Sequence, residues 1–164
     1  MLKPESLRRH LEATAPWVAA HPDRLLTFID EGDVRSTLRA GLSFEYRYTL
    51  NLIATDFEGH ADTLIVPILL WLRRHQPEML QNPELMRAGF AFEADILTHQ
   101  TMDLSIKLQL TERVIVSTVD GAMRATHADE PALDPYEGVV DTWELINTQP
   151  NTAPDWTVPI PTPV

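Results

Sequence analysis

The sequence predicts a mixed α+β domain, in which a sheet of three to five strands packs with two main helices. Two stretches with apolar residues at every second position, 44–55 and 102–110, indicate strands with one buried face. Two stretches with helical spacing, 4–18 and 63–75, indicate helices that cover this face. Hydrophobic residues make up 44% of the 164-residue chain, which is enough for the core of one domain.

The first predicted helix begins at Pro4, because the missing N–H of proline costs little at the first helical position. Pro16 should kink or end this helix near its last turn. The next two apolar stretches, 25–29 and 34–38, flank the polar residues Asp30 to Asp33, which include a glycine. Two short apolar runs around such a turn predict a β-hairpin.

The helix over 63–75 is apolar on nearly all sides, which indicates burial against the sheet. Asp62 or Thr63 is expected to cap its start through a side-chain oxygen. A short helix should follow, with Asn82 as its cap and Gly89 at its end.

Two further strands are predicted in the second half of the domain. Apolar residues alternate over 90–96, and the longer strand over 102–110 follows. Glu112 interrupts its pattern, and the apolar residues at 114–116 then continue as strand. Asp120-Gly121 is a pair typical of a tight turn.

The composition changes near residue 126, so we expect a globular domain over 1–126 and an acidic, Pro-rich arm over 127–164. The arm holds seven of the 13 prolines and seven acidic residues but no Lys or Arg, so it supplies −7 of the net charge of −11. Proline lacks an N–H and fixes φ, so a long helix or central strand is not expected there. Its spaced apolar residues predict an extended arm that docks on a neighbouring subunit or partner.

The charge balance and the longest apolar run exclude several classes of protein. A net charge of −11 argues against broad binding to nucleic-acid phosphates and against a polybasic membrane anchor. Phe44, Tyr46 and Tyr48 share a strand face and could stack on bases, but a core or interface face is more common at that spacing. The longest apolar run, 64–72, is nine residues, whereas a bilayer span needs about 20. No signal peptide follows Met1, which predicts a soluble cytoplasmic protein.

The candidates for catalysis are few, and the chain has no cysteine. Asp56, His60 and Asp62 could hold a cation, but the same residues suit a connection between a strand and a helix. Glu93 and Asp95 could form a carboxylate pair, although acidic side chains are common on solvent-facing strands. Phosphate-loop, kinase and hydrolase motifs are missing. We interpret the chain as a non-enzyme without metal or cofactor; a small metal-dependent hydrolase is an alternative, and a nucleic-acid-binding module is another.

A set of short blocks, in order along residues 1–125, carries a family resemblance. The blocks are Met1-Leu-Lys-Pro, Ser6-Leu-Arg-Arg, Leu42-Ser-Phe-Glu, Tyr48-Thr-Leu-Asn, Thr55-Asp-Phe, Leu64-Ile-Val-Pro, Trp71-Leu-Arg, Gln76-Pro, Gly89-Phe, Phe92, Ala94-Asp-Ile, Leu110-Thr-Glu-Arg and Val119-Asp-Gly-Ala. In these blocks the chain resembles the tail completion protein R (GpR) family of contractile-tailed temperate phages. The C-terminal arm is only loosely similar.

The resemblance implies a structural virion protein with a tail-terminator-like fold and no catalytic residues. Such a protein forms a ring, as a hexamer, on the head-proximal end of the tail tube, where it ends polymerisation and provides the surface for head joining. The implied partners are further copies of the chain, the tail tube protein, and the sheath and head-completion or neck proteins. Sequence-specific nucleic-acid binding, a membrane and a cofactor are not implied. Assembly would occur in the host cytoplasm, and a connector or adaptor in the virion neck is the alternative role.

Two sets of apolar residues are candidates for subunit or partner contacts. A ring needs contacts between different surfaces, which the predicted hairpin and the arm could supply. An acidic ring around a channel would also repel DNA phosphates and let DNA pass. The hairpin candidates are Phe28, Ile29, Val34 and Leu38, and the arm candidates are Trp143, Leu145, Ile146, Trp156, Val158 and Ile160.

Overall fold

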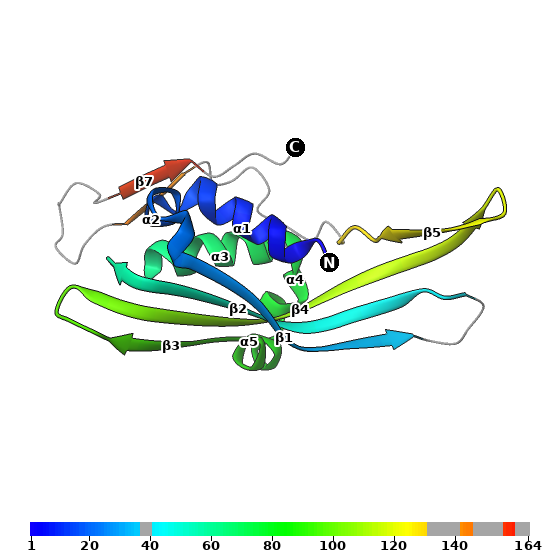
Figure 1. Cartoon of the computed structure of the whole chain (residues 1–164), viewed down its shortest axis with the longest axis horizontal. Helices are drawn as coiled ribbons and strands as arrows, with labels where there is room; N and C mark the ends of the chain where they lie inside the picture. Colours follow the sequence, from blue (N-terminus) through cyan, green and yellow to red (C-terminus); the bar gives the residue numbers. More distant parts are fainter. Residues whose placement is uncertain (37–40, 131–141, 146–155, 160–164) are drawn as a thin grey trace.

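A curled antiparallel sheet with its longest helices on one face forms the body of the protein in our computed structural model (Figure 1). The structure describes residues 1–36, 41–130, 142–145 and 156–159. The predicted α+β class is confirmed. The elements are α1 (Lys3–Thr14), α2 (Pro16–Ala20), a 3-10 turn (Pro22–Arg24), β1 (Leu25–Ser36), β2 (Phe44–Glu58), α3 (Asp62–His75), α4 (Pro77–Gln81), α5 (Pro83–Gly89), β3 (Phe90–Ile96), β4 (Thr101–Val119), β5 (Ala122–His127), β6 (Thr142–Leu145) and β7 (Trp156–Pro159).

The main sheet has five strands in the order β1-β2-β4-β3, and β5 pairs with the far half of β4. One edge of the 19-residue β4 pairs first with β3 and later with β5, while β2 lies along its other edge. The predicted continuation of the strand beyond Glu112 is confirmed, since β4 passes through the interruption of the apolar pattern without a break. The predicted turn at Asp120 and Gly121 is confirmed, with φ of 52° and 76°.

The core lies between the sheet and the helices α1 and α3. We call the side of the sheet that these helices cover the helix face, and the other side the opposite face. The alternation along β2 and β4 places one apolar row on the helix face, as predicted. The helices are also joined by a hydrogen bond of 3.1 Å from Trp71 Nε1 to Ser6 Oγ. The core includes Leu7, Leu11, Leu50, Leu52, Phe57, Leu64, Ile68, Trp71, Leu72, Leu104, Ile106 and Leu108.

The predicted hairpin after the first helical segment is wrong, because its two halves form one strand, β1. Asp30 pairs with Thr49 and Asp33 with Arg47, so two residues of β1 face one of β2 in a β-bulge. Glu31 in this bulge has a φ of 51°. The same polar residues suit a turn or a bulge. The bulge prevails because it allows β2 to pair with β1 on both sides of the irregularity.

Three predicted helix boundaries can be compared with the structure. Pro16 does end the first helix, since α1 stops before it and α2 starts at it. Asn82 caps α5, because its Oδ1 accepts a backbone N–H at 2.9 Å. The side-chain cap expected from Asp62 or Thr63 is wrong. Instead His60 Nδ1 accepts the Asp62 N–H at 3.2 Å. No helix among the described residues is long and apolar enough to cross a membrane.

Candidate functional site

The interface candidates on β1 do not share one face of the sheet. The register with β2 places Phe28 on the opposite face and both Ile29 and Val34 on the helix face. All three side chains are exposed, by 48%, 42% and 61%. Leu38 lies outside the described residues. Since these exposed side chains lie on both faces and β1 is also an edge strand, another molecule can contact the strand from either face or along its edge.

Four of the six arm candidates lie in a small antiparallel ribbon of β6 and β7. Trp143 pairs with Val158, and Leu145 pairs with Trp156. The structure therefore places these four residues in two backbone pairs of the ribbon, which are separated by the pair of Glu144 and Thr157. Ile146 and Ile160 lie outside the described residues, so their part of the predicted arm has no structural description here.

The candidate cation site at residues 56–62 is a connection between β2 and α3. His60 Nδ1 lies 3.1 Å from Asp62 Oδ2, at the start of the helix. Asp56 lies in a bulge of β2, where its backbone N–H donates to Asp103 Oδ1 at 2.8 Å. Within the described ranges, no three acidic, histidine or cysteine side chains are grouped so that they could hold a metal ion. These residues shape the entry to α3.

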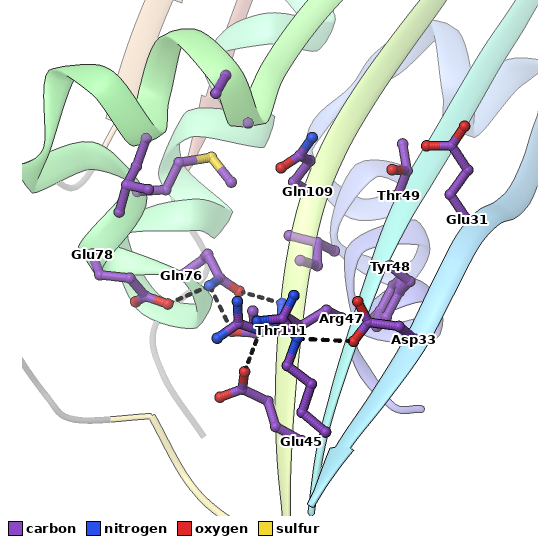
Figure 2. A pocket seen from close by; sticks show the side chains of 16 residues that line it. Glu31, Asp33, Glu45, Arg47, Tyr48, Thr49, Gln76, Glu78, Gln109 and Thr111 are labelled. Carbon is purple, nitrogen blue, oxygen red and sulfur yellow. Dashed lines mark hydrogen bonds and ion pairs between the residues drawn. The ribbon is translucent and has the colours of Figure 1, made fainter.

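A cavity of about 480 Å³ lies between α4, α5 and the opposite face of the sheet (Figure 2). Its arginines are paired within their own strands: Arg47 Nε lies 2.5 Å from Glu45 Oε1, and Arg35 Nε lies 3.3 Å from Asp33 Oδ1. The lining contains no histidine. It thus lacks the pair of nucleophile and histidine base that many hydrolases use. The charged side chains in the lining are Glu31, Asp33, Arg35, Glu45, Arg47 and Glu78.

Glu112 places a buried carboxylate on the helix face, where its side chain is only 4% exposed. Its Oε2 accepts the Leu2 N–H at 2.7 Å, and its Oε1 accepts the Lys3 N–H at 3.2 Å and the Tyr48 hydroxyl. His127 Nδ1 lies 3.0 Å from Oε2. A negative charge is favourable at the start of α1, because the helix dipole is positive there. The charge thus joins α1, β2, β4 and the end of β5.

The pKa of Glu112 reflects two opposing effects. Burial alone would raise it, but the hydrogen bonds from Tyr48 and from the two backbone N–H groups lower it, and the net pKa is below the ordinary value. Burial, with the hydrogen bond to Glu112, raises the pKa of the Tyr48 hydroxyl. At neutral pH the carboxylate is therefore charged and the phenol donates to it. The hydrogen-bonded pair of Glu112 and Tyr48 therefore has a structural role and does not exchange protons at neutral pH.

A second polar network surrounds Lys3, whose Nζ lies 2.7 Å from Gln76 Oε1 and 2.6 Å from Glu130 Oε1. Gln76 is buried after α3 and also accepts the Thr111 N–H at 3.2 Å. Thr111 lies between the part of β4 that pairs with β3 and the part that pairs with β5. Gln76 thus occupies the gap in this sheet edge, and Glu130 fixes the chain beyond β5. Sequence reasoning missed the networks around Glu112 and Lys3. In the sequence, each network is visible only as single polar residues among apolar ones, and nothing there indicates which of them meet.

Two histidines lie between α1 and α3. His10 Nε2 is 3.0 Å from the Pro67 carbonyl oxygen, and the His75 ring stacks on Trp71 with centroids 4.5 Å apart. Burial is the main cause that lowers both pKa values, and the Lys3 charge contributes to lowering that of His75 to about 4. Both rings are neutral at physiological pH and serve packing and hydrogen bonding.

The most exposed apolar side chains lie on β3 and β5, where sequence reasoning placed no contact site. Phe92 and Ile96 are 62% and 81% exposed, although both lie on the helix face of the sheet. Met123 on β5 is 72% exposed on the same face. The alternation along β3 predicted a covered face. The described helices leave this face uncovered in a single copy of the chain.

Comparison with known proteins gives a family. The model of the P2 phage tail completion protein R (GpR) family matches residues 1–131. Tail completion protein R of Escherichia phage P2 is 50% identical over 145 residues, which cover 88% of this chain and 92% of that protein. No solved structure matches. The resemblance predicted from the sequence is confirmed, and the chain belongs to the P2 phage tail completion protein R (GpR) family.

Proposed function

We propose that this chain caps the head-proximal end of a phage tail tube, ends tube polymerisation and presents the surface to which the head joins. The observation that carries the proposal is the 50% identity to a tail completion protein over most of both chains. A cap must bind the last ring of the tube and leave no surface for the next one. The role is structural and needs no catalytic group.

The surface of the domain supports a role in an assembly. Exposed apolar side chains lie on both edge strands of the sheet, β1 and β3, and on the β4–β5 hairpin. Exposed apolar side chains that gather on strand edges are typical of contact sites between proteins. Both arginines of the cavity are paired with an acidic side chain of their own strand, and the lining contains no histidine, which gives little support to the hydrolase alternative.

The proposed partners are further copies in a hexameric ring, the tube protein, and the sheath and head-completion proteins. A ring forms when two different surfaces meet and the rotation between copies closes. The net charge of −11 would line such a ring with negative potential and keep DNA from adhering during passage. The proposed location is the head-proximal end of the virion tail, after assembly in the host cytoplasm.

The test is electron microscopy of lysates from the phage with an early stop codon in this gene. Full heads beside unattached tails, with tubes of abnormal length or ragged upper ends, are the expected result. Unattached tails of normal length with sound ends would instead favour a connector or adaptor in the neck. Intact infectious virions would contradict both roles.

The candidates on β1 can be tested by adding a charge. Phe28→Asp and Val34→Asp should block ring assembly, whereas the melting temperature should change little because both side chains are exposed. Gln81→Asp adds the same charge at an exposed position on α4 and serves as the control. Normal assembly of both β1 variants would remove this strand from the interface.

The arm can be tested by deletion of residues 131–164. The cut after Glu130 keeps its ion pair with Lys3 and the contact between His127 and Glu112. We expect weaker assembly or head joining with little loss of melting temperature. A large loss of melting temperature with assembly intact would instead make the arm, with Trp143, Leu145, Ile146, Trp156, Val158 and Ile160, part of the fold.

A further inference from the structure

We propose that β3 of one copy pairs edge to edge with β5 of the next copy, so that the sheet continues from subunit to subunit. This inference rests on the proposed function only in that copies of the chain assemble. It names the contact surface, which neither the family nor the sequence assigns.

The first support is a difference between the edge strands. Proteins protect an exposed strand edge with bulges, prolines or charged residues, above all lysine. The edge strand β1 has such protection, because it is bulged between Asp30 and Asp33 and carries charges on both sides of the bulge. The edge strand β3 pairs regularly with β4 without a bulge and contains no proline, glycine or lysine. Its charged residues, Glu93 and Asp95, are both acidic and lie on the opposite face. Its free edge is therefore suited to pairing.

The second support is the uncovered face of β3. Phe92, Ala94 and Ile96 lie on the helix face beside the core residues of β4, yet Phe92 is 62% and Ile96 is 81% exposed. An alternating strand of this kind is normally covered on its apolar side. A neighbouring strand with small and apolar side chains on the same face would contact this row and bury part of it.

The third support is that β5 also needs a partner. Beyond Val114, which pairs with Phe44, β4 pairs in the sheet with β5 alone. An isolated two-stranded ribbon is marginally stable in water, and a third strand makes it far more stable. The six residues of β5 match the seven of β3 in length, and the free edge of β5 contains no proline.

The fourth support is that the two strands complement each other on both faces. On the helix face, β5 presents Met123 and Ala125 to meet the apolar row of β3. On the opposite face, β5 carries Arg124 and β3 carries Glu93 and Asp95. Pairing of β3 with a second β3 would instead bring these carboxylates together, which costs free energy. The charges therefore favour the pairing of unlike strands.

The position of the two strands suits repeated assembly. Figure 1 shows β3 at one end of the elongated sheet and β5 at the opposite end. Each copy thus offers two different strand edges, that of β3 and that of β5, and a heterologous contact requires two different surfaces. Such a contact can close into a ring.

The chain contains no cysteine, so a disulfide crosslink can form only between cysteines that are introduced. Single chains would carry one cysteine in β3, at Ala91 or Ala94, and one in β5, at Ala122 or Ala125. A disulfide forms only when the two Cα atoms come within about 7 Å. After oxidation, we expect at least one of these pairs to give a ladder of dimers and higher multimers. The control replaces the β5 cysteine with one at Gln81, an exposed position on α4.

The ladder is read in purified virions and in the concentrated purified chain. No ladder from any β3–β5 pair in either sample would overturn the proposed contact, and so would an equal ladder from the control that pairs β3 with Gln81. The amount of the chain in the virion is measured on the same gel. If the chain is absent from the virion, the proposed function would be contradicted, whereas the contact between β3 and β5 would still be tested by the purified chain.

A charge exchange adds an independent readout. Arg124→Asp and Asp95→Arg should each remove the ladder, because each brings like charges together. The double variant should restore the ladder, since the opposite charges then meet again. Arg124 and Asp95 are both exposed, so the melting temperatures of the three variants should stay close to that of the unchanged chain. Loss of the ladder in the double variant, with both single variants normal, would contradict the predicted pairing.

Discussion

The Tyr48 hydroxyl on β2 donates a hydrogen bond to the buried carboxylate of Glu112 on the neighbouring strand β4. The same carboxylate accepts the first backbone N–H groups of the chain, at Leu2 and Lys3. A buried charge is tolerated only when its hydrogen bonds are satisfied, and here three are supplied, by β2 and by the start of α1. The pair therefore fixes where α1 starts relative to the sheet.

Glu112→Gln should lower the free energy of unfolding by about 2–4 kcal/mol, because the amide leaves hydrogen-bonding groups of a buried network unsatisfied. Urea denaturation at neutral pH measures the loss. The exposed Glu93→Gln is the control and should change the value by less than about 0.5 kcal/mol. Since the pKa of Glu112 is lowered, its contribution is present above the ordinary value of 4.5 and lost as the pH falls below it. If Glu112→Gln lowers the free energy of unfolding no more than Glu93→Gln does, the structural role of Glu112 would be contradicted.

The melting temperature should fall as the pH is lowered from 6.5 to 4. His75 has a pKa of about 4 in the folded chain against 6.5 for the free side chain, so the unfolded chain binds more protons within this window. The free energy of unfolding therefore rises with pH across the window and is constant above it. His10 acts in the same direction.

The variant His75→Gln removes this proton uptake and should flatten the pH dependence between 4 and 6.5. Thermal unfolding over this range measures the slope. His99→Gln, at an exposed position between β3 and β4, should leave the slope unchanged. An unchanged slope in His75→Gln would assign the acid sensitivity to other groups.

Asn82→Ala should destabilise the domain by about 1 kcal/mol, the usual cost of losing a helix cap. Asn82 Oδ1 accepts two backbone N–H groups at the start of α5, which borders the cavity and leads into β3. Denaturant titration measures the change. The adjacent Gln81→Ala lacks such a bond in the described structure and should be nearly neutral. Equal effects of the two substitutions would argue against the cap.

Gly121→Ala should destabilise the β4–β5 hairpin by about 1 kcal/mol, because the φ of 76° at this turn disfavours any residue with a side chain. Hydrogen exchange of the β5 amides measures the local effect. Gly41→Ala is the matched control, since no atom lies within 4 Å of its added Cβ and its φ is not positive. If the hairpin also carries the proposed contact, Gly121→Ala should weaken assembly, and Gly41→Ala should not.

Much of the fold could be predicted from patterns along the chain. The alternation over 44–55 and 102–110 and the apolar helix over 63–75 all match elements of the structure, because burial of one face imposes a period that is visible locally. The end of the first helix at Pro16 and the cap at Asn82 were also predictable, since both depend on near neighbours in the chain. The ordered blocks of residues likewise pointed to the family that the comparisons show.

The candidate site was harder to predict. Phe28 and Val34 were correctly identified as apolar residues on a strand, but the faces that they occupy depend on the bulge in β1. Whether residues 30–33 form a turn or a bulge depends on the strand that lies beside them, which is remote in the sequence. Glu112 reads as a break in an apolar pattern until the start of α1 and Tyr48 are placed around it.

Local periodicity was thus sufficient for the class of the fold and most of its main elements, because each depends on residues a few positions apart. The family followed instead from the ordered blocks along residues 1–125. The arrangement in space was needed to show that Glu112 is buried and that Phe92 and Ile96 remain uncovered. Burial depends on which elements meet over a given face, and those elements are brought together by contacts between residues far apart in the chain.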